Sequence, residues 1–138
     1  MIDNCKTDIA YGNGAYCYYV MRSNSQMRSD FNIKKMDMIE LTDEMCDYLC
    51  IHYPTLKDPI LRRRIYSRFN ILRQLTYYDN TTKDIRLEIT KYILDNFHFI
   101  LTNKCVPYRD KIAAVLLFIN PRLFFNAWAL YRKVKYGK

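Results

Sequence analysis

Apolar residues recur at helical spacing through most of the chain after residue 32, and residues that start or stop helices separate the repeats. Asn32 is a good helix N-cap, and the Tyr53–Pro54 step ends the first segment. In the second, Asp58 is placed to cap the helix and Pro59 to take its first position. The pattern predicts five helices, which cover residues 32–52, 58 to about 75, 81 to about 102, 108–119 and 121–135.

Each predicted helix has an apolar face that we expect to form the core of one bundle. The second helix offers Leu61, Ile65, Phe69, Leu72 and Leu75, with five arginines, including Arg68 and Arg73, on its other faces. The third helix offers Ile85, Ile89, Tyr92, Ile93, Phe97 and Ile100, and the first offers Met36, Ile39, Met45, Tyr48, Leu49 and Ile51. Cys46 and Cys50 stand one helical turn apart, and we interpret them as core-facing residues, because two thiols with no histidine nearby make a poor zinc site.

Residues 7–21 have a different character, with "TDIAY" and "AYCYYVM" on either side of a "GNG" turn. This arrangement predicts a β-hairpin. Two strands alone are marginal in water, so the hairpin needs a further surface, and its free edge could also pair with a second copy of the chain. The expected fold is therefore mainly α, a single domain over residues 1–138, with an N-terminal β-hairpin followed by a bundle of about five helices.

The charge is asymmetric along the chain. Lys and Arg number 22 against 14 Asp and Glu, a net charge of +8, but residues 1–55 are net acidic and residues 56–138 are strongly basic. A basic half suits an anionic membrane surface, a phosphorylated ligand, a nucleic acid or simply water. The lack of a helix-turn-helix signature argues against nucleic acid, and no uncharged run reaches the roughly 18–20 residues that a membrane span needs.

The chemistry-bearing motifs expected of an enzyme are missing from these residues. The three glycines, at positions 12, 14 and 137, form no phosphate-binding loop, and there is no Asp-x-Asp, His-Glu-x-x-His or Gly-x-Ser-x-Gly. We therefore expect the chain alone to bind no metal or cofactor and to be inactive. The polar N-terminus and the odd number of cysteines favour a reduced, cytoplasmic setting.

Two cationic features are candidates for contact with an anionic surface. Arg62, Arg63 and Arg64 could bind phosphates or could form a solvated helix face. The last helix combines a wide apolar surface with Arg132, Lys133 and Lys135, and either lies in a membrane interface, with Trp128 and Tyr131 at headgroup level, or docks on the bundle.

Three stretches, read together, resemble the C-terminal region of bacterial family-two glycosyltransferases, the inverting, nucleotide-sugar-dependent enzymes of cell-surface polysaccharide synthesis. They are "AYCYYVMRSNSQMRSDFNIKKMDMIE", "HYPTLKDP…FNILRQL" and "RDKIAAVLLFINPRLFFNAWALYRKVKYGK". The resemblance covers nearly the whole chain. It implies a helical region that supports an upstream catalytic domain of the same polypeptide and associates peripherally with the inner membrane. The divalent metal and the nucleotide-sugar would belong to that upstream domain.

The resemblance also implies a role for the end of the hairpin. Arg22 takes the family's cationic position near the donor diphosphate, Ser25 takes the hydroxyl position, and Tyr19 lies on the preceding strand. A guanidinium there would stabilise the charge that develops on the leaving diphosphate. Val20 stands where family members often carry a further arginine, and an exposed Arg22 on a tyrosine-packed hairpin is the alternative.

Two functions follow as expectations. In the first, the chain is the non-catalytic C-terminal region of such a glycosyltransferase. In the second, it is a free-standing basic helical module that binds an anionic membrane surface or a protein partner.

Overall fold

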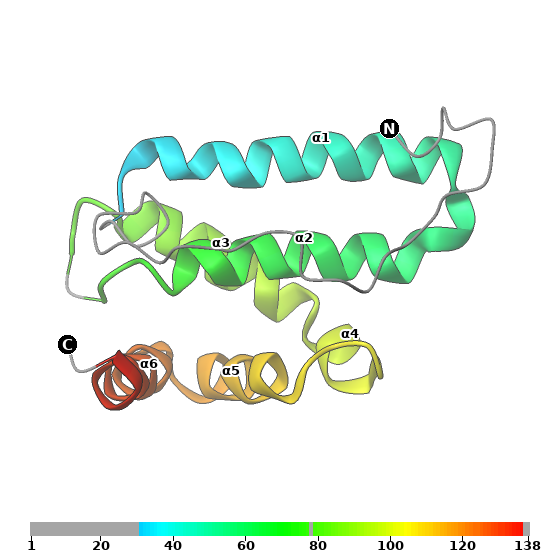
Figure 1. Cartoon of the computed structure of the whole chain (residues 1–138). Coiled ribbons are helices and arrows are strands. Elements are labelled where there is room, and N and C mark those ends of the chain that lie inside the picture. Colours follow the sequence, from blue (N-terminus) through cyan, green and yellow to red (C-terminus); the bar gives the residue numbers. More distant parts are fainter. Residues whose placement is uncertain (1–30, 78, 137–138) are drawn as a thin grey trace, which may run out of the picture.

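The computed structural model describes residues 31–77 and 79–136 (Figure 1). The hairpin predicted over residues 7–21 lies outside them. Within the described residues the chain is mainly α-helical, as predicted, with six α-helices and two short 3-10 turns. The elements are the 3-10 turn Ile33–Met36, α1 (Asp37–His52), the 3-10 turn Pro54–Leu56, α2 (Lys57–Leu72), α3 (Lys83–Asp95), α4 (Phe97–Thr102), α5 (Tyr108–Ile119) and α6 (Pro121–Tyr136).

The helices form three layers (Figure 1). Helix α1 forms one outer layer and packs on α2, which also contacts α3. Helices α4, α5 and α6 form the opposite outer layer, in which α5 contacts both α4 and α6 and also packs against α3. The outer sides of α1 and of the α4–α6 layer therefore point away from each other.

The core lies between the middle layer and the α4–α6 layer. Its largest fully buried side chains include Phe69 and Leu72 of α2, Ile93 of α3 and Leu117 of α5. The apolar faces predicted for the second and third helices are confirmed in their main positions, since Ile65, Phe69, Leu72, Leu75, Ile89, Ile93 and Ile100 are all buried. At roughly 1.5–3 kcal/mol for each large side chain, this burial is the main force that holds the layers together.

Several of the predicted helix boundaries are wrong; the first α-helix, for example, begins at Asp37 and not at residue 32. The third helix is broken at Asn96 into α3 and α4, because the Asn96 side-chain amide donates to the Tyr92 carbonyl oxygen, 2.8 Å away, and competes with the backbone. Helix α2 begins at Lys57, directly after the 3-10 turn that Pro54 opens. Asp58 therefore lies inside the first turn, where its charge suits the helix dipole, rather than at the cap.

The two cysteines of α1 differ. Cys46 is fully buried, as predicted, and burial raises the pKa of its thiol. Cys50 is exposed, so its prediction as a core residue is wrong. The apolar stripe predicted for α1 is likewise divided into partly buried and exposed residues. Met36, Ile39 and Leu49 are partly buried, whereas Met45, Tyr48 and Ile51 are exposed.

Candidate functional site

The residues predicted at the diphosphate side of a glycosyltransferase site, Arg22, Ser25 and Tyr19, lie outside the described part of the chain. The structure therefore leaves that prediction untested. The cationic residues of α2 and α6 are described, except for the side chain of Lys135, and they separate into two kinds. Some hold the bundle together, and others stay exposed to solvent.

The triple arginine of α2 is divided between these roles. Arg64 reaches across to α1, where it pairs with Asp47 and lies 3.5 Å from Asp43. Arg62 and Arg63 are exposed, and the Arg63 guanidinium lies 5.7 Å from the centre of the Tyr66 ring. Arg64 is therefore engaged in the α1–α2 contact, and the predicted role of the three arginines at an anionic surface stays a prediction.

Arg68 ties the same two helices together from a more buried position. Its guanidinium donates to both carboxylate oxygens of Asp43, at 3.0 and 2.7 Å, and lies 3.7 Å from the centre of the Tyr92 ring. A pocket of about 200 Å³ opens beside it, and its other charged lining residues, Glu88, Lys91 and Asp95, carry mixed signs. Since Arg68 is already paired, we assign no ligand to this pocket.

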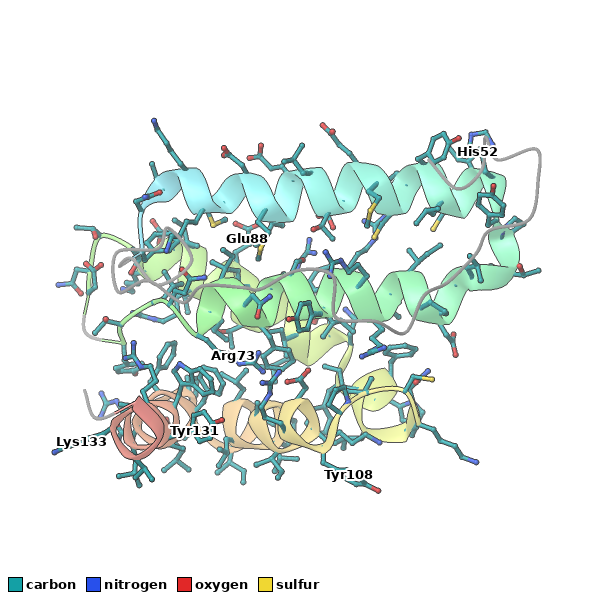
Figure 2. All side chains as sticks on the ribbon, in the orientation of Figure 1. His52, Arg73, Glu88, Tyr108, Tyr131 and Lys133 are labelled. Atoms are coloured by element: carbon teal, nitrogen blue, oxygen red, sulfur yellow. The ribbon has the colours of Figure 1, made fainter. Side chains whose placement is uncertain are left out.

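Arg73, at the end of α2, fastens the α4–α6 layer to the bundle. It is buried and forms an ion pair with Asp110 of α5, which is also buried. Figure 2 labels Arg73 between α2 and the α4–α6 layer. The indole Nε1 of Trp128 in α6 donates to the Arg73 carbonyl oxygen at 2.9 Å, and the Trp128 ring lies 5.2 Å from the guanidinium. Burial lowers the pKa of Arg73, while the Asp110 carboxylate opposes that shift and keeps the charge in place. One residue thus positions both α5 and α6.

This ion pair has a consequence for the surface of the layer. Asp110 is the only acidic residue in the sequence between residues 96 and 138, and it is turned into the bundle. The described part of the α4–α6 layer therefore exposes no carboxylate. Its basic residues are Lys104, Arg109, Lys111, Arg122, Arg132 and Lys133.

The outer side of α5 is apolar although it faces solvent. Tyr108, Ile112, Val115 and Ile119 follow helical spacing, and they are 84%, 61%, 37% and 65% exposed. The opposite side of the same helix carries the buried residues Ala113, Ala114 and Leu117. A helix that is apolar on both sides is typical of one that is covered on both sides, by protein or by lipid.

Helix α6 continues this apolar surface. Phe124 and Phe125 are buried and Trp128 is half-buried, so one side of the helix docks on the bundle. Leu123, Leu130 and Val134 are exposed on the other side. We refer to the exposed residues Tyr108, Ile112, Val115, Ile119, Leu123, Leu130 and Val134 as the α5–α6 apolar face. In Figure 2 the labelled Tyr108 points from this face away from the bundle.

The candidates predicted on the last helix fall on different sides of it. Trp128 is turned towards Arg73, and Tyr131 stacks on it with ring centres 5.1 Å apart. Arg132 and Lys133 are exposed near the end of α6, and Lys133 points outwards in Figure 2. Docking on the bundle and an outward apolar surface are therefore both present in α6, and they belong to different faces.

Neither the exposed apolar row on the outer side of α5 nor the buried ion pair Arg73–Asp110 was predicted from the sequence. The signal for the α5 side was available, because four large apolar residues at helical spacing lie opposite a pair of alanines. Asp110 carried a weaker signal, as the single acidic residue in a long basic and apolar stretch.

None of the described helices combines the length and the apolar character that crossing a membrane requires. The chain matches no family model, no curated protein and no solved structure.

Proposed function

We propose that this chain is a helical module that binds the surface of an anionic membrane through the α5–α6 apolar face. The observation that carries the proposal is the outer side of α5, a continuous row of exposed apolar side chains in a layer that exposes no carboxylate over its described residues. Such a helix would lie in the plane of the interface, with apolar residues among the acyl chains and basic residues at the headgroups.

The distribution of charge supports binding of this face to an anionic membrane. Arg109 and Lys111 accompany the apolar row of α5, and Lys133 follows the apolar side chains of α6. Each Lys or Arg near an anionic bilayer contributes about 1 kcal/mol of attraction, and an apolar row adds the free energy of burying its side chains. Because the described part of the α4–α6 layer exposes no carboxylate, both contributions can act on the same side of the molecule.

Co-sedimentation with vesicles tests the proposal. We expect the full chain to bind vesicles rich in phosphatidylglycerol, to bind phosphatidylcholine vesicles much more weakly, and to lose affinity as salt is raised. Ile112→Ser together with Leu130→Ser should lower the partition coefficient by at least about a hundredfold, since each change removes about 1.5–3 kcal/mol of apolar burial in the interface and about 1.4 kcal/mol is a factor of ten. Both side chains are exposed, so stability should change little.

Leu87→Ser is the matched control, because Leu87 is an exposed leucine of α3, outside the proposed face. It should leave vesicle binding unchanged. Equal binding to both kinds of vesicle, or a double variant that binds as well as the native chain, would contradict the proposal. Trp128→Ala is a poorer probe, since losing the contact with Arg73 would loosen α6 itself.

The resemblance to a family-two glycosyltransferase stays a separate prediction. Membrane binding is compatible with it, because a C-terminal region of such an enzyme would hold its catalytic domain near the bilayer. The coding sequence upstream of the Met1 codon tests it. An in-frame region that encodes Asp-x-Asp followed by Glu-Asp would support the prediction, and a stop codon directly before Met1 would contradict it.

A further inference from the structure

Helix α1 lies on the side of the molecule opposite the α4–α6 layer (Figure 1), and its outer side is a second exposed apolar surface. Leu41, Met45, Tyr48 and Ile51 are 65%, 44%, 53% and 77% exposed. Over the described residues no other helix packs on this side of α1. We refer to these four residues as the α1 outer face.

The charge of α1 is the reverse of that of the α4–α6 layer. The helix carries five carboxylates and no Lys or Arg. Asp43 and Asp47 are turned towards Arg64 and Arg68 of α2, whereas Glu40 and Glu44 are exposed beside the α1 outer face. An apolar strip with exposed glutamates beside it fits a surface that is apolar and basic.

The chain itself provides a surface of that kind. We infer that the α1 outer face of one copy packs on the α5–α6 apolar face of a second copy, in a head-to-tail contact. The residues on the two sides follow similar helical spacing, with Leu41, Met45 and Tyr48 on one side and Tyr108, Ile112 and Val115 on the other. Glutamates of α1 would then lie near the basic residues of the opposing layer.

Charge selects this arrangement over a symmetric dimer. A symmetric contact through α1 would bring the carboxylates of two copies together, and one through α5 and α6 would bring together two basic surfaces. Juxtaposition of like charges disfavours association at an interface. The head-to-tail contact pairs opposite charges and still buries the apolar residues of both faces.

The position of the two faces determines how such a contact grows. Because they lie on opposite sides of the molecule, each copy could accept a second partner in the same way. A head-to-tail contact of this type builds open chains unless the rotation between copies closes a ring. We therefore expect a range of masses that rises with concentration, rather than one fixed dimer.

Analytical ultracentrifugation of the full chain tests the inference. At low salt, the average mass should rise above the monomer mass of 16.7 kDa as concentration increases from micromolar to submillimolar, and salt should weaken the association. Two double variants separate the faces: Glu40→Lys with Glu44→Lys on α1, and Arg132→Glu with Lys133→Glu on α6. Each variant alone should associate at least tenfold more weakly, since like charges then meet in every contact.

A mixture of the two double variants gives the decisive result. Each reversed face then finds a complementary one on the other variant, so an equimolar mixture should associate at least tenfold more strongly than either component alone. Glu88→Lys, at an exposed position of α3, is the matched charge control and should associate like the native chain. A native chain that stays monomeric throughout, or a mixture that stays monomeric while the native chain associates, would overturn the inference.

The same variants keep this inference distinct from membrane binding. Glu40→Lys with Glu44→Lys leaves the α5–α6 apolar face unchanged, so it should weaken self-association at least tenfold without weakening vesicle binding. Association of the native chain without vesicle binding would support the inference and contradict the proposed function. Vesicle binding by a strictly monomeric chain would support the proposed function and contradict this inference.

Discussion

At the scale of single residues, the fold depends on a few buried charges. Arg73 and Asp110 are both almost fully buried, and they join α2 to α5 while Trp128 of α6 binds the Arg73 carbonyl oxygen. The Nε atom of Arg73 has no hydrogen-bond partner among the described residues, so the guanidinium relies on its contact with Asp110. Removing that carboxylate would leave a buried positive charge uncompensated.

We predict that Asp110→Asn lowers the free energy of unfolding by about 3–5 kcal/mol, the usual cost of breaking a buried ion pair. Adding Arg73→Met to this variant should restore much of the loss, because the buried charge is then gone. Urea unfolding followed by circular dichroism measures both effects. Asp95→Asn, at an exposed position of α3, is the control and should change stability by no more than about 0.5 kcal/mol. Additive losses in the double variant would contradict the pairing.

At the scale of helices, the sequence predicted where α5 and α6 begin better than it predicted which side of each helix faces the core. Residues 108–119 and the start of α6 at Pro121 were predicted as found, because Pro107 and Asn120–Pro121 are strong local punctuation. The Asn120 side chain indeed accepts from the Arg122 backbone N–H at 2.9 Å. The break at Asn96 escaped prediction, since one asparagine in a periodic helix carries no definite stop signal.

The side of each helix that faces the core could not be predicted from the sequence, because it depends on contacts between residues that are distant along the chain. Arg68 and Arg73 were expected on polar faces and are buried, since their partners Asp43 and Asp110 are far away in the sequence. Helix α5 presents apolar residues on both sides, and only packing decides which side the core takes. The diphosphate-side residues predicted in the N-terminal stretch lie outside the described part of the chain. That part of the candidate site therefore stays a prediction.

Two substitutions in α6 test whether one side of this helix is packed on the core while the other side is exposed to solvent. We predict that Phe124→Ala lowers the free energy of unfolding by about 3–5 kcal/mol, because it leaves a cavity in the core. Leu130→Ala, on the exposed side, should change it by no more than about 0.5 kcal/mol. Thermal and urea unfolding measure the two values. Comparable losses would mean that the exposed side of α6 is also packed in solution.

At the scale of the whole molecule, the three layers place unlike surfaces on opposite sides. Helix α1 carries the exposed acids Glu40 and Glu44 on one side, and the α4–α6 layer carries basic residues and the α5–α6 apolar face on the other. Two exposed cysteines can each carry a label on one of these two sides. Cys50 lies in α1, and Cys105 lies in the connection between α4 and α5.

A polarity-sensitive dye attached to Cys105 should therefore shift to shorter emission wavelength when the protein binds anionic vesicles, and the same dye on Cys50 should not. The measurement uses two variants, each with one of these cysteines as its only thiol. A shift at Cys50 alone, or equal shifts at both positions, would contradict the proposed orientation. Titration with phosphatidylcholine vesicles provides the baseline for each dye.

The burial of Asp110 also affects how the protein would approach a bilayer. Because that carboxylate is buried, the described part of the α4–α6 layer exposes only positive charges, one of which, Arg109, is also paired with Asp110, and the exposed glutamates of α1 lie at the opposite end. Within roughly one Debye length of a negative surface, about 8–10 Å at physiological ionic strength, such a charge distribution exerts a torque on the molecule. The protein would then turn before it touches the bilayer, so that a large share of collisions, whatever their starting orientation, would end with α5 and α6 facing the lipid.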